Sequence, residues 1–314
     1  MKLIELVDLM ATRLERAGVA FGHGTTNAFD EAAWLVLWRL GKPLDALDDI
    51  ADQALSAAQQ TEVEALVAQR INTRQPAAYL TGEAWLHGVP FTVDARCIVP
   101  RSLIAELLAH PDYQHALDTW LSDRTQRVLD LCTGNASLAV LAAMAFPDVV
   151  VDAADLSADA LAVAALNVAR HGLEQRIALY LGDGLAALPR ESAVAEPPRD
   201  NGSAAEAKRY DLILCNPPYV NSASMAALPD EFRAEPELAL AGGADGMDFV
   251  RVLLAHAAEH LSPEGVLVLE IGHERAFFDA AFAALDVVWL PTSAGDDQVM
   301  LITRDALLAA APPR

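Results

Sequence analysis

The residues with the clearest chemical capability are Asn216-Pro217-Pro218-Tyr219, which follow the apolar run 212–215. Such a run is typical of a buried strand, and the two prolines restrict the backbone that leaves it. The stiff loop presents two acceptors, the side-chain oxygen of Asn216 and the carbonyl oxygen of Pro217. These match a planar NH2 group with two hydrogens, on which the Tyr219 ring can stack. The motif therefore predicts a clamp for an amide or an exocyclic amine, and the alternative is a proline-rich turn after a core strand.

A second group of candidates lies at the ends of other expected strands. The loop 130–137 has neither the three glycines of a dinucleotide fingerprint nor the Gly-Lys-Ser/Thr of a phosphate loop. Asp155, 21 residues after Gly134, can accept hydrogen bonds from ribose hydroxyls, and Asp183 can accept from an adenine amine. Each aspartate alone is more often a helix or turn cap. Together, at successive strand ends, they predict a pocket for a nucleoside without phosphates.

Strands and helices alternate from about residue 102 onward. The expected strands cover 127–132, 149–154, 177–181, 211–215, 266–271, 287–290 and 299–303, and helical patterns such as 158–170 and 249–260 fall between most of them. This alternation predicts an α/β fold with a mostly parallel sheet of seven strands and helices on both faces. The last two strands have no helix between them, so we expect them to pair antiparallel.

The remainder of the chain predicts two further parts. Residues 1–72 carry apolar stripes at helical spacing and predict a small helical domain. Residues 73–101 combine aromatic and β-branched residues with glycines, which predicts a β-hairpin that bridges to the domain 102–314. Residues 190–209 are polar and rich in turn formers, which predicts a surface loop without an assigned function.

Composition narrows the class of partner. The formal net charge is −22 with three lysines in 314 residues, which disfavours a nucleic-acid substrate and favours a basic protein; a role in solubility alone is the alternative. Three widely spaced cysteines and scattered histidines predict neither a disulfide framework nor a metal site. Acidic residues interrupt the N-terminal apolar pattern, and the longest apolar stretch, 138–146, is too short to span a bilayer. We therefore expect a cytoplasmic protein without a membrane partner; the sequence makes no prediction of oligomeric state.

A nucleoside pocket without phosphate machinery, beside an amine clamp, points to S-adenosylmethionine as cofactor. Here the chain resembles the class I methyltransferases, which have a Rossmann-like sheet, and more closely the protein glutamine N5-methyltransferases. The resemblance covers nearly the whole chain. The segments 79–85, 99–102 and 228–238 are similar to the subgroup that modifies ribosomal protein L-three. The sister subgroup acts on peptide-chain release factors and usually has Pro-Arg-Pro where this chain has Pro100-Arg101-Ser102.

The resemblance implies roles for a set of residues at the strand ends. Those implied to hold the cofactor are Cys132, Thr133, Gly134, Asn135 and Ala136 around its methionine part, Asp155 on the ribose, Asp183 and Gly184 near adenine, and Asn216. It also implies that Asn216, Pro217 and Tyr219 act in catalysis, and that they bind the substrate together with Pro218. The family usually has glycine in place of Ala136, whose methyl group would crowd the cofactor if the backbone there needs a positive φ.

The expected activity is therefore N5-methylation of a glutamine in the basic ribosomal protein L-three. We expect the N-terminal helical domain to recognise the substrate and the domain 102–314 to transfer the methyl group. Three alternatives stay open. A release-factor methyltransferase would share every catalytic residue. An adenine-N6 nucleic-acid methyltransferase could use the same clamp, although the acidic charge disfavours it. A ribosome-assembly binding factor could retain the pocket without turnover, with Ala136 as its trace.

Overall fold

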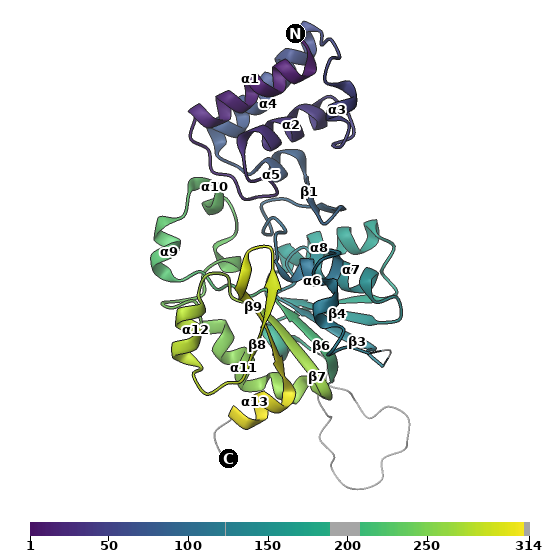
Figure 1. Cartoon of the computed structure of the whole chain (residues 1–314), viewed down its shortest axis with the longest axis vertical. Helices are drawn as coiled ribbons and strands as arrows, with labels where there is room; N and C mark the ends of the chain where they lie inside the picture. The colour runs from purple at the N-terminus through teal and green to yellow at the C-terminus, as the bar shows by residue number, and fades with distance from the viewer. Residues whose placement is uncertain (123, 189–207, 311–314) are drawn as a thin grey trace. The chain divides into compact units, whose positions relative to one another are not determined.

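The computed structural model describes residues 1–122, 124–188 and 208–310 (Figure 1). They belong to two compact units. Unit 1 comprises Met1–Arg101 and Ala227–Pro236, and unit 2 comprises Ser102–Ala226 and Glu237–Arg314. Of the loop predicted at 190–209, all but the last two residues lie outside the described residues.

Unit 2 is built on a seven-stranded sheet, as predicted. Its strands, in spatial order, are β5 (Ile177–Leu181), β4 (Val150–Asp155), β3 (Arg127–Leu131), β6 (Tyr210–Cys215), β7 (Leu261–Glu270), β9 (Gly295–Thr303) and β8 (Val288–Thr292). The first five are parallel neighbours. β8 and β9 pair antiparallel, which confirms the prediction for the last two strands, and β9 is also antiparallel to β7.

The strand β7 begins earlier than the apolar run at 266–271 predicts. The first half of β7 contains Pro263 and Gly265, and these residue types predict a turn. The structure nevertheless pairs Leu261 with Tyr210, and the register shifts between that pair and the regular ladder. An irregular pairing of this kind accommodates proline at the start of a strand.

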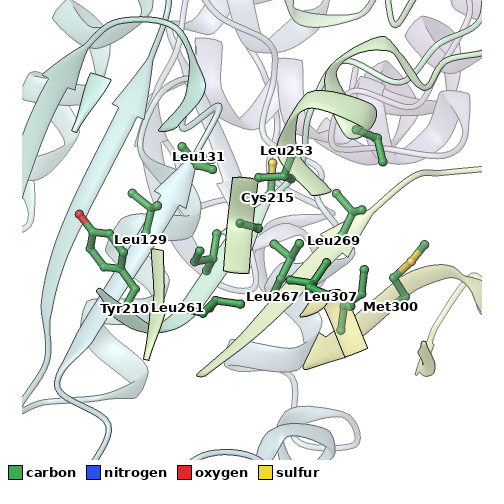
Figure 2. Packing of buried hydrophobic residues seen from close by; sticks show 14 of the residues in the cluster. Leu129, Leu131, Tyr210, Cys215, Leu253, Leu261, Leu267, Leu269, Met300 and Leu307 are labelled. Carbon is green, nitrogen blue, oxygen red and sulfur yellow. The ribbon is translucent and has the colours of Figure 1, made fainter. Parts of the chain in front are cut away.

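Helices cover both faces of this sheet. Those of unit 2 are α6 (Ile104–Ala109), α7 (Ser137–Ala145), α8 (Ala158–Arg170), α11 (Asp248–His260), α12 (Arg275–Ala281) and α13 (Arg304–Ala310), with the 3-10 turns η1 (Gln114–Leu117), η2 (Gly184–Ala187) and η3 (Glu237–Ala239). The helix α9 (Ser222–Ala227) ends where the chain enters unit 1. Helices α6, α7 and α8 pack in sequence along one another, and α11 packs against α13. Figure 2 shows the apolar side chains of β3, β6, β7 and β9 packed with Leu253 of α11 and Leu307 of α13.

Unit 1 is mainly helical and contains the predicted hairpin. Its elements are α1 (Leu3–Arg16), α2 (Ala28–Arg39), α3 (Leu47–Ile50), α4 (Ala57–Thr73), α5 (Ala77–Thr81), β1 (Glu83–Leu86), β2 (Val89–Thr92) and α10 (Asp230–Arg233). β1 and β2 pair antiparallel. Helix α10 comes from a segment more than 125 residues further along the chain than the rest of the unit (227 minus 101).

Buried ion pairs attach that distant segment to unit 1. Arg70 on α4 is fully buried, and its guanidinium lies 2.9 Å from Glu31 and 3.3 Å from Glu231. Glu235 accepts from the Val99 amide at 2.8 Å and from Arg101 at 2.7 Å. Burial alone raises the pKa of Glu235, but the contacts with His23 and Arg101 outweigh it and lower that pKa to about 2. The segment 227–236 is therefore held by Glu231 and Glu235, whose lowered pKa values reflect their pairing with Arg70 and Arg101.

Candidate cofactor and amide-binding site

The loop that follows β3 turns sharply before it enters α7. Cys132, Gly134 and Ala136 all have left-handed backbone angles, with φ of 57°, 57° and 65°. Ala136 is fully buried and is the residue that precedes the first turn of α7. Glycine adopts this conformation without steric cost, whereas a side chain with a Cβ pays for it. The structure thus has the positive φ at Ala136 on which the predicted crowding of the cofactor by its methyl group depends.

Replacement of Ala136 by glycine should therefore relieve backbone strain. We expect the free energy of unfolding to rise by about 0.5–1 kcal/mol, with cofactor affinity equal to or better than that of the parent. The control is Ala139→Gly, at a buried position in the first turn of α7. This substitution should lower stability by about 1 kcal/mol. Chemical denaturation and calorimetry measure both effects. A large loss of affinity in Ala136→Gly would contradict the assignment of this loop to the cofactor.

Asp155 at the end of β4 organises the same loop. One carboxylate oxygen accepts from the Gly134 amide and the other from the Ser157 amide, both at 2.8 Å. Burial raises the pKa of Asp155, and the backbone hydrogen bonds partly oppose that effect. Because a carboxylate oxygen has two acceptor positions, each oxygen can take one further hydrogen bond from a ligand hydroxyl.

Asp130 is a site residue that the sequence reasoning did not single out. Its carboxylate is fully buried at the end of β3, where one oxygen accepts from the Thr133 hydroxyl at 2.5 Å and from the Ala139 amide at 3.0 Å. The other oxygen is buried and has no hydrogen-bond partner among the described residues. The available signal was an acidic residue inside the apolar run 128–131, because a carboxylate in such a place is costly unless it serves a site.

Asn135 has a buried hydrogen-bond donor without a partner among the described residues. Its side-chain oxygen accepts from the Ser137 amide at 3.2 Å, and its backbone carbonyl accepts from Asn167 at 2.9 Å. Its side-chain nitrogen is buried without a partner in the described part of the chain. The loop thus offers one unused donor, on Asn135, and one unused oxygen, on Asp130, which is an acceptor when that carboxyl is ionised. The methionine part of S-adenosylmethionine carries an ammonium donor and a carboxylate acceptor, so the donor set of the loop fits this cofactor.

The buried carboxyl of Asp130 predicts a pH dependence of stability. Burial raises its pKa to about 7, so between about pH 4 and pH 7 the unfolded chain loses this proton while the folded protein keeps it. Stability should therefore fall as pH rises through that window, by up to about 1.4 kcal/mol per pH unit from this group, and level off above it. Urea denaturation of the cofactor-free protein at several pH values measures the slope. In Asp130→Asn the slope should be smaller, and identical slopes in the two proteins would contradict the prediction.

Asp183 and Gly184 follow β5, the neighbour of β4. The backbone at Gly182 donates to the carbonyl of Asp155 at 3.0 Å, which brings this turn beside the second strand end. The Asp183 side chain is exposed. Gly184 has a φ of 51°, and a Cβ there would lie 3.5 Å from the Phe249 ring. The structure therefore places both residues at the same edge of the sheet as Asp155, with an aromatic ring beside them.

The motif Asn216-Pro217-Pro218-Tyr219 follows β6, the other neighbour of β3. Cys215 pairs with Leu131 in the ladder, so Asn216 and Cys132 leave adjacent strands at the same edge. Pro217 is buried and Asn216 is partly exposed. Within the described residues, no hydrogen bond engages the Asn216 carboxamide, which remains available to a ligand. The parallel order of β5, β4, β3 and β6 thus brings all the predicted strand-end residues to one edge.

Glycines shape the space around Tyr219. A Cβ at Gly272 would lie 2.5 Å from the Tyr219 ring, and a Cβ at Gly242 would lie 2.7 Å from its Cα. A Cβ at Gly246 would collide with its carbonyl oxygen. These three glycines, which the sequence reasoning did not connect with the motif, allow the backbone and the ring of Tyr219 to be enclosed closely.

Glu270, at the end of β7, links the motif to the segment after Arg101. Its carboxylate is buried, accepts from the Ser102 hydroxyl at 2.5 Å and from the Leu103 amide at 2.9 Å, and lies 3.4 Å from the Tyr219 hydroxyl. Burial raises the pKa of Glu270, and these hydrogen bonds partly oppose the effect. Ser102, one of the residues that distinguish the two subgroups in sequence, therefore contacts the same carboxylate as the clamp tyrosine.

Among the described residues, no group of three or more His, Cys, Asp or Glu side chains is arranged to hold a metal ion. None of the helices in that part of the chain is long and apolar enough to cross a membrane.

Residues 114–243 match the family model of the methyltransferase small domain. A solved methyltransferase from Pyrococcus furiosus is 18% identical, with a TM-score of 0.45 over 70% of this chain and 90% of that chain.

Similarity to curated relatives extends over nearly the whole chain. The ribosomal protein uL3 glutamine methyltransferase of Bordetella pertussis is 52% identical over 97% of this chain and 96% of that protein. The protein of the same name from Burkholderia pseudomallei is 52% identical over 98% and 96%, and that from Neisseria gonorrhoeae is 44% identical over 97% and 95%. Identity at this level over both full lengths shows that the chain belongs to the family of ribosomal protein uL3 glutamine methyltransferases.

Proposed function

We propose that this chain transfers a methyl group from S-adenosylmethionine to the side-chain nitrogen of a glutamine in ribosomal protein uL3. The observation that carries the proposal is the position of the Asn216 carboxamide, unpaired among the described residues and next along the sheet edge to the loop 132–136. This position supports an amide clamp next to a loop that holds the methyl donor. The proposal places the chain in the cytoplasm, because its substrate is a ribosomal protein.

Residues of the loop after β3 are assigned to the methionine part of the cofactor. Asp130 accepts from its ammonium and Asn135 donates to its carboxylate, with the left-handed turns at Cys132, Gly134 and Ala136 exposing the backbone between them. Thr133 holds Asp130 in place. When bound, S-adenosylmethionine supplies an electrophilic methyl group on a positively charged sulfur. Asp155 is assigned to the ribose, and Asp183 with Gly184 to the adenine.

The clamp activates a weak nucleophile. A glutamine side-chain nitrogen shares its lone pair with the adjacent carbonyl, and positive charge develops on it during transfer. The Asn216 side-chain oxygen and the Pro217 carbonyl accept the two N–H groups, which stabilises that charge and aims the nitrogen. Pro218 stiffens the loop, and the Tyr219 ring packs on the amide plane. The alkylated amide is acidic enough to lose its proton to water, so no residue is assigned as general base.

The ribose assignment can be tested by binding alone. Asp155→Ala should weaken S-adenosylmethionine binding by roughly 1.5–3 kcal/mol, because a charged acceptor is lost, and because Gly134 loses its partner. Asp159→Ala, an exposed carboxylate in the first turn of α8, is the matched control for charge and should bind as the parent does. Calorimetry measures both. Unchanged affinity in folded Asp155→Ala would remove the ribose assignment.

The substrate is tested by direct competition. Equal amounts of purified uL3, a release factor and duplex DNA are incubated with the protein and labelled S-adenosylmethionine. We expect the label on uL3, and mass spectrometry should place the methyl group on a glutamine side chain. Because a basic substrate is attracted by the charge of −22, the rate at low substrate concentration should fall as salt is raised. Preferential labelling of the release factor or of DNA would overturn the proposal.

A further inference from the structure

Unit 1 contains a cavity formed by its own residues alone, with a volume of about 780 Å³. Three of the five tryptophans in the chain line it, Trp34 and Trp38 on α2 and Trp85 on β1. This volume falls in the range of binding pockets for small ligands or single side chains with their flanking backbone. Aromatic walls of this extent suit a flat group that can stack on an indole face.

One of these tryptophans has an unused donor. Trp34 is only 9% exposed, and its indole N–H is buried without a hydrogen-bond partner among the described residues. A buried indole N–H normally finds an acceptor, because leaving it unpaired is costly. Because this nitrogen has almost no exposed surface, Trp34 contributes its ring and not its N–H to the cavity lining.

Negative charge also reaches the cavity. Its lining includes two carboxylates, Asp45 and Glu83, against one ammonium, Lys42. The indole N–H of Trp85 donates to Glu83 at 3.0 Å, so this carboxylate and this indole ring are held together. Trp85 is 42% exposed, which leaves its ring accessible to a partner. A ring face beside a fixed carboxylate is an arrangement that attracts a cationic group.

We propose that this cavity binds an arginine side chain of the basic protein substrate. The inference rests on the proposed function for the identity of the substrate. The choice of arginine rests on the residues that line the cavity. A guanidinium is planar, stacks on aromatic rings and pairs with carboxylates. Trp85 and Glu83 receive the guanidinium, and the rings of Trp34 and Trp38 line the rest of the cavity. The overall charge of −22 favours the approach of such a segment.

Binding is tested without methyl transfer. In the ¹⁵N-labelled protein, the indole N–H signals of Trp34 and Trp85 should shift on titration with N-acetyl-arginine amide, whereas those of Trp120 and Trp289 in unit 2 should not. The citrulline analogue has the same shape without the charge and should bind at least about tenfold more weakly. Equal shifts with the citrulline or lysine analogue, no shifts, or shifts of all the indoles would each overturn the proposal.

Kinetics then test whether the cavity serves the substrate. Trp85→Ala and Glu83→Gln should raise KM for uL3 between about threefold and thirtyfold, with kcat and S-adenosylmethionine affinity within about twofold of the parent. Glu64→Gln, on α4 in the same unit and not in the cavity lining, removes the same charge and should leave KM unchanged. An unchanged KM in both cavity variants would refute the role of the cavity while the proposed function stands. Absence of transfer to uL3 by the parent would refute the proposed function, and the indole titration would still decide the binding of arginine.

Discussion

Replacement of Asn216 by alanine is expected to lower the turnover of methyl transfer by about 10²–10³-fold. On the proposed mechanism its side-chain oxygen accepts from the substrate amide where positive charge develops in the transition state, so its loss acts on kcat more than on substrate affinity. Because no hydrogen bond engages this carboxamide within the described residues, stability should change little. Single-turnover rates at saturating cofactor, together with urea denaturation, measure the two effects.

A second asparagine in the same loop gives the contrasting control. Asn221 is buried and donates to Glu274 at 2.7 Å and to Ser224 at 3.1 Å. Asn221→Ala should therefore lower stability by about 1–3 kcal/mol and affect the single-turnover rate much less than Asn216→Ala does.

Asn216→Asp separates the acceptor from the rest of the carboxamide. It keeps an oxygen that can hold the substrate N–H groups, but it adds a negative charge that favours the positively charged cofactor in the ground state and it removes the amide donor. We expect this variant to bind S-adenosylmethionine and to transfer slowly. If single-turnover rates of both Asn216 variants equal that of the parent, the motif is only a turn after a strand.

Arg70→Met is expected to destabilise unit 1 by about 3–5 kcal/mol. The guanidinium is fully buried and neutralises Glu31 and Glu231, and it also donates to the carbonyl of Ala20 at 2.9 Å. Methionine fills much of the same volume but leaves two buried carboxylates without this partner. Urea denaturation followed by the fluorescence of Trp34 and Trp38, which lie on α2 near Glu31 in sequence, measures the loss.

The loss of stability caused by Arg70→Met should depend on pH. Burial already raises the pKa of Glu31 in the intact protein, and removal of the cation raises it further. Below about pH 4 the carboxyl is protonated in both the folded and the unfolded state and adds no penalty. As pH rises above the ordinary pKa of 4.5, the unfolded chain ionises first, so the variant should lose stability relative to the parent.

Arg74→Met provides the control for charge and length. Arg74 also contacts Glu231, at 3.2 Å, but its side chain is 31% exposed. Screening by solvent makes such a pair weaker, so the expected loss is about 1 kcal/mol. Equal losses in the Arg70 and Arg74 variants would contradict the view that burial of Arg70 sets the size of the effect.

The sequence alone determined those features that depend on neighbours along the chain. Runs of apolar residues located all seven strands, and the helix 158–170 has the bounds that its pattern predicts. The absence of a helical pattern between the last two strands predicted their antiparallel pairing. The rigidity of Asn216-Pro217-Pro218-Tyr219 also follows from local restrictions on proline and on the residues before it. Parallel order then requires that the strand-end residues share one edge.

The tertiary structure decided what depends on residues far apart in the chain. The contact of Ser102 and Tyr219 with Glu270, and the close approach of Gly272 to the tyrosine ring, join segments from different parts of the chain. The segment 227–236 likewise joins unit 1 through carboxylates that meet Arg70 and Arg101. Such contacts leave little periodic signal, because burial of a polar group is favourable only when its partner arrives from elsewhere in the fold.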